Sequence, residues 1–263
     1  MPIGSITRGT TGTNRLRRVD RWIGRLPAFL RSPAPLIVDL GFGASPATAL
    51  EMHDRLSLIR DDVRVVGIEI DPARVAIAAL SARDGVSFQL GGFEVPLEHG
   101  RPATVIRAFN VLRQYGEADV LAHWHRMALR LESGGVLVEG TCNESGRVAG
   151  WVDVTQEGPA SLTLSLRLTG LELPSIVAER LPKVLIHRNV PGERIHALMA
   201  ELDRHWRLHV GLGTFSPRQR WIATVASLAG EGWPVIGARG RSRLGELTIA
   251  WDAVAPAGFD WRA

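Results

Sequence analysis

The residues whose types and spacing point most directly to chemistry lie between Leu36 and Gly43. An apolar run leads into Asp39, and two glycines, Gly41 and Gly43, follow with Phe42 between them. This order predicts a buried strand that enters a tight loop. Because glycine has no Cβ, the backbone of such a loop can approach a bound ligand closely. Loops of this form bind nucleotide- or nucleoside-type ligands in α/β proteins.

Two residues of this loop narrow the choice of ligand. Asp39 lies two positions before Gly41, where its carboxylate would repel the pyrophosphate of a dinucleotide. Pro46 takes the place of the third glycine in the G-x-G-x-x-G pattern. A ligand that carries a sulfonium and an ammonium group is compatible with the carboxylate. The loop therefore favours S-adenosylmethionine over a dinucleotide.

Further motifs follow the loop in a fixed order. They are residues 66–72 with Gly67 and Glu69, a strand end at Asn110, and residues 133–137. Together with the loop, this set resembles the class I S-adenosylmethionine-dependent methyltransferases over residues 36–140. The rest of the chain is similar to a bacterial group of methyltransferases without an assigned substrate. The resemblance implies an α/β, doubly wound, Rossmann-like fold with a mostly parallel seven-stranded sheet and an N-terminal arm.

The resemblance also implies which residues contact the cofactor. Glu69 would accept hydrogen bonds from both ribose hydroxyls, since a carboxylate offers two acceptor oxygens. Ile70 would pack on the adenine ring, and Asn110 would contact the amino-acid part. The expected cofactor residues are Asp39, Gly41, Phe42, Gly43, Glu69, Ile70, Gly92, Phe93, Asn110 and Val111.

One position departs from the family pattern. After the third strand the family often has an acidic residue that receives the adenine amino group, whereas this chain has residues Gly91, Gly92, Phe93 and Glu94. We expect the amino group to meet a backbone carbonyl, with Phe93 providing an apolar wall. Glu94 is the alternative acceptor.

No catalytic residue is identified from the sequence. Tyr115 follows the fourth strand, Glu139 and Glu144 lie in a polar run after the fifth, and His187 precedes a Pro-Gly turn. Each is a candidate for removing a proton or orienting a substrate. Each also has a structural explanation as part of an ordinary loop or turn. Cys142 is not expected to act as a nucleophile, because methyl passes directly from sulfonium to acceptor.

Composition limits the class of protein. The chain has 263 residues, of which 45% are hydrophobic, which suits one α/β domain with a modest extension. The single cysteine excludes an internal disulfide and a Cys-rich zinc site. We expect no metal site, since His205 and His209 have no obvious third ligand. The absence of a long apolar run and of an apolar signal segment predicts a cytoplasmic protein without a membrane partner.

Strands and helices are expected to alternate in the first half. Residues 1–35 are predicted to form a basic arm with a helix over about 15–30, followed by a methyltransferase domain over 36–263. Within that domain, residues 36–145 form the cofactor-binding half, and 146–263 complete the sheet and the substrate side. The expected strands are 36–40, 64–70, 86–90, 104–109, 136–139 and 247–251, with a hairpin of 151–154 and 161–168 and late helices at 193–206 and 218–229.

The basic residues leave alternatives open. Lys183 is the only lysine among 31 basic residues. A GC-rich genome explains such a bias, but Arg15, Arg17 and Arg18 would also suit RNA phosphates, an anionic substrate or a cap on the cofactor. The sequence thus predicts a methyltransferase with a small-molecule acceptor. The alternatives are an RNA-directed methyltransferase and a regulatory protein that binds the cofactor without transfer. The sequence predicts no oligomeric state.

Overall fold

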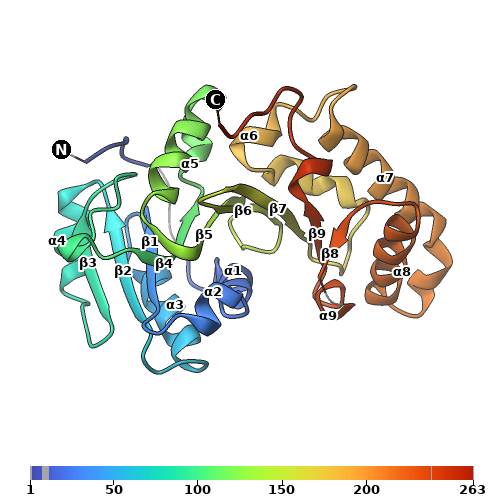
Figure 1. The fold of residues 1–263 in the computed structure, drawn as a ribbon. Coiled ribbons are helices and arrows are strands. Elements are labelled where there is room, and N and C mark those ends of the chain that lie inside the picture. Colours follow the sequence, from blue (N-terminus) through green and yellow to red (C-terminus); the bar gives the residue numbers. More distant parts are fainter. Residues whose placement is uncertain (1, 8–11, 238, 263) are drawn as a thin grey trace.

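The computed structural model describes residues 2–7, 12–237 and 239–262. In this part of the chain one sheet of nine strands runs through the molecule in the order β3-β2-β1-β4-β5-β6-β7-β9-β8 (Figure 1). The strands are β1 Leu36–Leu40, β2 Arg64–Glu69, β3 Val86–Leu90, β4 Ala103–Phe109, β5 Leu131–Cys142, β6 Ala149–Thr155, β7 Gly158–Ser165, β8 Val235–Ile236 and β9 Glu246–Ala250. The α-helices are α1 Arg17–Ile23, α2 Pro27–Arg31, α3 Ala47–Ser57, α4 Pro72–Ala79, α5 Val120–Ala128, α6 Lys183–Ile186, α7 Arg194–Leu208, α8 Pro217–Gly230 and α9 Arg239–Ser242.

The first five strands are parallel and form the doubly wound part of the sheet. From β1 the chain moves outward to β2 and β3, then returns to pair β4 and β5 on the other side of β1. Every residue of β1 is buried, including Asp39, as expected for a central strand of a parallel sheet. The strand order reverses between β1 and β4, and in open α/β sheets ligands bind outside the carboxyl ends at such a point. The predicted bounds of β1 and β3 are confirmed.

Helices cover both faces of this half. Helices α1, α2 and α3 pack on one face in a core that includes Phe29, Met52 and Trp151. Helix α5 packs on the opposite face, in a core that includes Trp124 and continues under α7 and α8. Figure 1 shows α1–α3 below the sheet, α5 above it, and α7 and α8 at its far end. The α/β, doubly wound fold class is therefore confirmed for the parallel half.

The prediction of seven mostly parallel strands is wrong for the second half. Strands β5, β6, β7, β9 and β8 lie side by side in this order, and each neighbouring pair is antiparallel. The predicted hairpin is present, and its turn joins Thr155 to Gly158 directly, which is far too short for a parallel crossover. Strand β8 has only two residues, so no periodicity in the sequence could reveal it.

Two further local expectations are corrected. The helix expected over 15–30 is broken into α1 and α2, because Leu26 is extended before Pro27, as residues that precede proline prefer. The fifth strand was expected to start at residue 136, but β5 starts at Leu131, so residues 133–135 lie inside it. The register of β5 against β4 shifts between Ala103 and Val105, so residues 133–135 form an irregularity of β5.

A buried arginine joins four elements below the parallel strands. Arg107 of β4 has no exposed side-chain surface, and its Nε lies 3.0 Å from Oδ1 of Asp39 in β1. The same guanidinium binds Asp20 of α1 and donates to the carbonyl of Thr48 in α3 at 3.0 Å. Burial raises the pKa of Asp20, which Arg107 and Arg55 oppose. Burial alone would lower the pKa of Arg107, but Asp39 and Asp20 raise it above its usual value, so the guanidinium stays charged.

This arrangement predicts a large loss of stability for Arg107→Met, which leaves the buried Asp39 without its cation and Asp20 with Arg55 alone. We expect the free energy of unfolding to fall by about 3–5 kcal/mol, the usual cost of breaking a buried ion pair from one side. Urea denaturation measures the loss. Arg55→Met is the control, since its guanidinium is partly exposed and is shared among Asp20, Glu51 and Asn14. A loss for Arg107→Met no greater than that for Arg55→Met would contradict the prediction.

Candidate functional site

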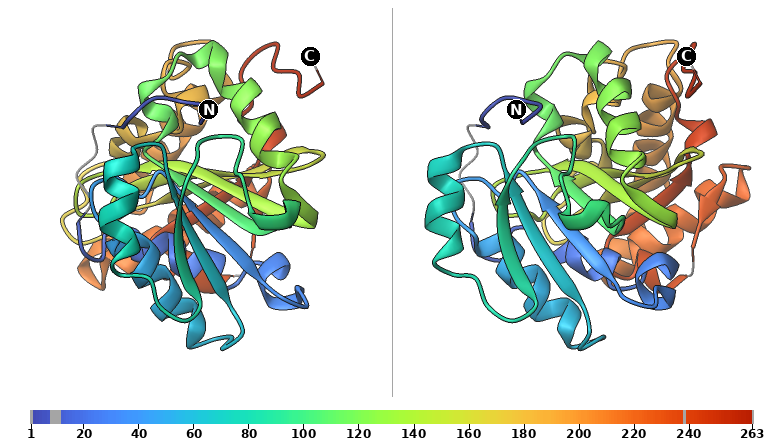
Figure 2. Two further views of the ribbon diagram at one scale, coloured as in Figure 1. Left: turned by 90° about the vertical axis from the view of Figure 1, so that its left-hand side faces the viewer. Right: turned by 60° about the vertical axis from the view of Figure 1, so that its left-hand side comes forward.

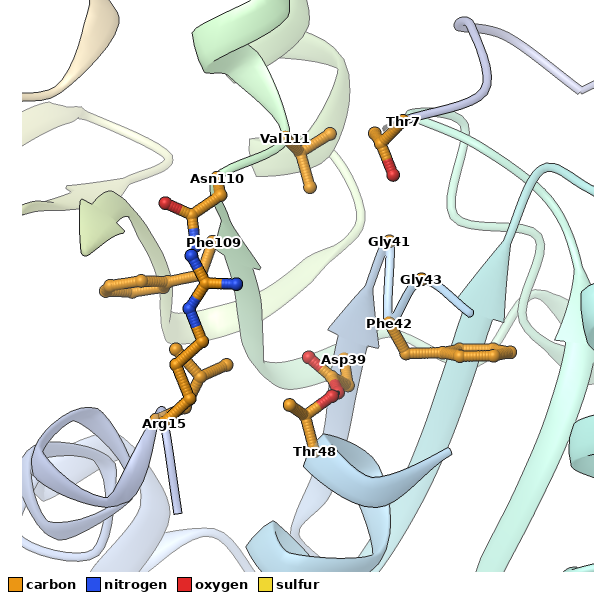
Figure 3. Close-up of a pocket in the computed structure, with 11 residues that line it drawn as sticks. Thr7, Arg15, Asp39, Gly41, Phe42, Gly43, Thr48, Phe109, Asn110 and Val111 are labelled. Carbon is orange, nitrogen blue, oxygen red and sulfur yellow. The ribbon is translucent and has the colours of Figure 1, made fainter. Parts of the chain in front are cut away.

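Two adjoining cavities open at the carboxyl ends of β1, β2 and β4. The first is surrounded by the β1 loop, the end of β4 and the start of α1, and the second by the ends of β2 and β3. Gly41, Val111 and Thr7 line both, so the two cavities adjoin and form one site. Figure 3 shows the first of them. The empty space in them, which is open to solvent, is about 470 and 270 Å³.

All of the cofactor residues expected from the sequence line this site. The first cavity contains Asp39, Gly41, Phe42, Gly43, Asn110 and Val111. The second contains Gly41, Glu69, Ile70, Gly92, Phe93 and Val111. Sequence reasoning did not assign Ile3, Thr7, Leu16 or Thr48 to the site, and it considered Arg15 only as part of an arm. The sole signal for that arm was its run of arginines, which says nothing about residues 3–7.

The loop after β1 needs both of its glycines. Gly41 and Gly43 have φ values of +71° and +81°, a region that favours glycine. A Cβ on Gly41 would also lie 2.6 Å from Cγ2 of Val111. Between them, Phe42 turns away from the ligand space and packs edge-on against Phe88, with ring centroids 5.3 Å apart. The loop backbone therefore forms the floor of the site, as the spacing of the glycines predicts.

Glu69 is the buried acid of the second cavity. Its side chain has no exposed surface, and its oxygens accept hydrogen bonds from the N–H groups of Gly43 at 2.8 Å and Ile70 at 2.9 Å. Arg74 lies 3.8 Å from Oε2. Oε1 also accepts from the N–H of Asp71 at 3.4 Å, so the acceptor capacity that remains for a ligand hydroxyl lies on Oε2. Asp71 caps α4 by accepting from the N–H of Ala73, as its position before Pro72 predicts.

Asp39 plays a different part from the one expected. Its carboxylate is bound by Arg107 and by the hydroxyl of Thr48 at 2.7 Å, so the side chain serves the buried network beneath the loop. Arg107 neutralises the charge that was expected to repel a pyrophosphate. Asp39 therefore does not by itself exclude an anionic ligand. It stabilises the loop from below.

The other end of the first cavity carries an amide and a guanidinium. Asn110 adopts φ +59°, a left-handed conformation that asparagine tolerates, and its Oδ1 accepts from the N–H of Cys142 at 3.0 Å. Arg15 extends toward it from the start of α1 (Figure 3), and its Nε donates to the carbonyl of Asn143 at 3.2 Å. This end of the site is therefore cationic and rich in hydrogen-bond donors.

Of the four catalytic candidates, only Tyr115 lines the site. Its hydroxyl oxygen lies 2.5 Å from the backbone nitrogen of Ser5. Glu144 lies outside both cavities, with 86% of its side chain exposed. His187 is exposed as well, with Nε2 3.0 Å from Nζ of Lys183.

The residues that follow His187 are used inside the fold. Arg188 binds Glu117 and Glu193, and Asn189 lies 3.3 Å from Nδ1 of His196. The cluster therefore connects α6 to its neighbours. It does not form the mouth of either cavity.

Glu139 is buried behind the site, on the face of the sheet that α5 covers. Within the described residues, neither of its carboxyl oxygens has a hydrogen-bond partner. Burial raises the pKa of Glu139 to about 8, although the neighbouring indole N–H of Trp124 opposes the shift. The protonated form is therefore favoured near neutral pH, and the group lies outside both cavities.

A separate cluster at the far end of the molecule has the geometry of a metal site. Side-chain atoms of Glu201, His205 and Glu231 lie within 4.8 Å of one another, so His205 has two acidic neighbours that were not apparent when it was considered together with His209. However, the guanidinium of Arg204 binds both carboxylates, at 2.6 Å for Glu201. Nδ1 of His205 pairs with the hydroxyl of Ser227 at 2.8 Å. The arginine already supplies the cation that this cluster needs.

Within the described ranges, no helix is both long and apolar enough to cross a membrane.

No family model and no curated protein matches the chain. Among solved structures, the methyltransferase CcbJ from Streptomyces caelestis is 18% identical, with 60% of this chain and 68% of that chain covered and a TM-score of 0.37. CalS10, an amino pentose methyltransferase from Micromonospora echinaspora solved with S-adenosylmethionine, is 22% identical, with 60% and 70% covered and a TM-score of 0.36. LepI in complex with S-adenosylmethionine is 16% identical, with 44% and 30% covered and a TM-score of 0.37.

These similarities concern part of the chain. It spans only 30% of the length of LepI and 34% of that of a second match, a pericyclic reaction enzyme. The matches also include a [4+2]-cyclase, SpnF, so they are not confined to methyltransferases by name. A shared ligand or activity does not follow from likeness at this level. The ligand is inferred below from the side chains of the site.

The state of Glu139 predicts a pH-dependent stability. The folded protein keeps this proton up to about pH 8, whereas the unfolded chain loses it near pH 4.5. The unfolded state thus binds fewer protons in this window, and stability falls as pH rises, by about 1.4 kcal/mol per unit at most. Glu139→Gln should remove this component, so its advantage over the natural protein in urea denaturation should grow between pH 5 and 8.

Asp153→Asn is the matched control for that experiment. Burial also raises the pKa of Asp153, to about 7. The pH range over which its proton makes stability fall with rising pH therefore ends about one unit lower than for Glu139. If the difference between Glu139→Gln and the natural protein is constant from pH 5 to 8, Glu139 is ionised in the folded state and the assignment is wrong.

Proposed function

We propose that this protein binds S-adenosylmethionine along the two cavities and transfers its methyl group to a small-molecule acceptor. The observation that carries the proposal is the chemistry of the two ends of one site. Glu69 lies at one end with acceptor oxygens, and Arg15 and Asn110 lie at the other. A nucleoside joined to an amino acid has the complementary groups, which are ribose hydroxyls at one end and a carboxylate at the other.

The residues fit this ligand group by group. Glu69 would accept from the ribose hydroxyls, and Ile70 and Phe93 would provide apolar surface for the base. Arg15 would pair with the carboxylate of the methionine part, and the amide of Asn110 would bind beside it. The loop glycines leave room for the ligand to lie directly on the backbone. Asp39, whose charge is balanced by Arg107, supports that backbone from beneath.

When bound, the cofactor supplies an electrophilic methyl group on a sulfonium. The protein's own contribution is then to align an acceptor and exclude water from the end of β4. The protonated form of Glu139 is favoured near neutral pH, and Glu144 and His187 lie away from the cavities. Tyr115 is the one predicted candidate that remains at the site. The geometry therefore favours acceptors whose nucleophile needs no strong enzyme base.

The RNA-directed alternative gains no support from the arm. Arg18 donates to Ser165 at 2.7 Å and to the carbonyl of Leu166 at 2.9 Å, inside the fold. Arg15 points into the first cavity. Of the three arginines considered for phosphate contacts, only Arg17 is exposed on α1. These contacts favour a role in the architecture and the ligand site.

Replacing the buried acid tests the cofactor assignment. Glu69→Ala should weaken binding of S-adenosylhomocysteine by roughly 1.5–3 kcal/mol, the scale of hydrogen bonds to a charged group, which is a rise in Kd of about 10- to 150-fold. Isothermal titration calorimetry measures it. Asp71→Ala is the control, because this nearby acid caps α4 and lies outside both cavities. An unchanged Kd for a folded Glu69→Ala protein would remove the ribose assignment.

The guanidinium at the other end gives a separate prediction. Arg15→Ala should weaken S-adenosylhomocysteine by about tenfold or more, since a charged hydrogen-bond partner of the carboxylate is lost. It should leave adenosine binding unchanged, because adenosine has no carboxylate. Arg17→Ala, an exposed neighbour on α1, should alter neither. If Arg15→Ala weakens adenosine as much as S-adenosylhomocysteine, Arg15 does not bind the amino-acid part.

A further inference from the structure

A segment of the arm lies across the second cavity. Residues 2–7, here called the N-terminal strap, pass between α4 and α5 over the carboxyl ends of the strands (Figure 2). Ile3 is half-buried and packs on the core, and Thr7 is buried. Ile6 between them is 56% exposed. The strap thus covers the end of the site that the proposed function gives to adenine.

The peptide groups of Ile3 make a matched pair of hydrogen bonds with the site. The N–H of Ile3 donates to Oε2 of Glu94 at 2.8 Å. The carbonyl of Ile3 accepts from the N–H of Phe93 at 2.9 Å. One residue of the strap therefore presents a donor and an acceptor side by side to a carboxylate and a backbone N–H.

Adenine carries the same pair on one edge. Its 6-amino group is a donor and its N1 is an acceptor, and proteins read this edge through such hydrogen bonds. An adenine at this position would give its amino hydrogen to Glu94 and accept the N–H of Phe93 at N1. Ile3 satisfies the same two groups in the same sense. Glu94 lies in the segment that departs from the family pattern, and its carboxylate already accepts a hydrogen bond from the chain itself.

The strap leaves no room for a second occupant at this edge. A Cβ on Gly92 would lie 2.0 Å from the carbonyl oxygen of Ile3, so strap and site are in direct backbone contact. At Gly4, with φ +137°, a Cβ would lie 2.9 Å from the hydroxyl of Tyr115 and 3.3 Å from the ring of Phe93. A purine ring and the strap therefore cannot both lie against Gly92 and Phe93.

The loop that holds Glu94 is itself strained. Val95 has φ +44°, a left-handed conformation that is an outlier for a β-branched residue. This turn brings the carboxylate of Glu94 back over its own loop, where Oε1 accepts from the N–H of Gly92 at 2.9 Å. Strain of this kind persists where the surrounding structure demands a particular arrangement. Here it aims one acidic group at the strap.

We propose that the strap is an internal competitor of adenine, which occupies the adenine-binding groups in the free protein and leaves them when the cofactor binds. This inference rests on the proposed function. Beyond Ile3, hydrogen bonds at Ser5 and Thr7 also hold the strap to the site. The N–H of Ser5 meets the hydroxyl of Tyr115, and Arg74 donates to the carbonyl of Thr7 at 3.0 Å. A site that is open in only a fraction of molecules binds its ligand with an affinity reduced by that fraction.

Removing the strap tests the proposal. A variant that lacks residues 2–7 should bind S-adenosylhomocysteine and adenosine at least tenfold more tightly than the full chain, as measured by calorimetry. Inosine, which has a carbonyl in place of the amino group and a hydrogen on N1, should gain less. Circular dichroism melting establishes that the shortened protein is folded.

A point variant repeats the test within the full chain. Ile3→Pro removes the N–H that donates to Glu94, and it should lower the Kd of adenosine. Ile6→Pro is the matched control, because the exposed Ile6 makes no described hydrogen bond to Glu94, Phe93 or Tyr115.

Movement is followed independently of affinity. A fluorophore on Ile6→Cys labels the strap alone, since Cys142 is the only other cysteine and is buried. Its anisotropy should fall when S-adenosylhomocysteine is added.

The outcomes separate the two proposals. If the full chain and the shortened chain bind S-adenosylhomocysteine equally well, the strap does not compete, although the proposed function stands. If the shortened chain binds more weakly, the strap is a wall of the site, which also overturns the competition. If neither chain binds the ligand, the proposed function itself is wrong.

Discussion

The site depends on a charge balance buried beneath its floor. Arg107 on β4 faces Asp39 on β1 and Asp20 on α1, and the carbonyl of Thr48 completes the set from α3. Two carboxylates and a guanidinium without exposed surface cannot be separated cheaply, because an uncompensated buried charge costs several kcal/mol. The network therefore fixes where β1 ends relative to β4. That junction is where the strand order reverses and where the two cavities open.

The glycine loop is stable only on this base. Gly41 and Gly43 supply the left-handed turns, and Gly67 leaves space that a Cβ would take from Phe88 at 2.6 Å. Phe42 then packs on Phe88, and the N–H of Gly43 reaches Glu69. Loop, aromatic pair and buried acid thus support one another. This explains how a short polar loop keeps a fixed shape at the edge of a sheet.

Much of this half was predictable because its signals are local. The apolar run of β1, the two glycines and the acid after Gly67 each place a residue at a strand end, and the parallel topology brings those ends together. Charge pairing was not predictable, since Arg107 looks like any strand residue until its register with Asp39 is known. In the antiparallel half, the hairpin and the strand at 247–251 were predicted, whereas β8 and the pairing of β9 with β7 were not. A two-residue strand carries no periodicity, and the pairing of a strand with a distant hairpin leaves no local signal.

The strap and helix α1 both belong to the N-terminal part of the chain and close opposite ends of the site. Helix α1 is held more firmly than the strap. Helix α1 is held by the buried Asp20–Arg107 pair and by core residues such as Ile23, so Arg15 at its start has a fixed position. Ile3 of the strap packs on the core and Thr7 is buried, and each hydrogen bond of the strap is worth only about 0.5–1.5 kcal/mol net. On the proposed function, ligand contacts at Glu69 and Glu94 would be of similar size to these hydrogen bonds, so a ligand could displace residues 2–7 while α1 stays in place. The amino-acid end would then be preformed, and the adenine end gated.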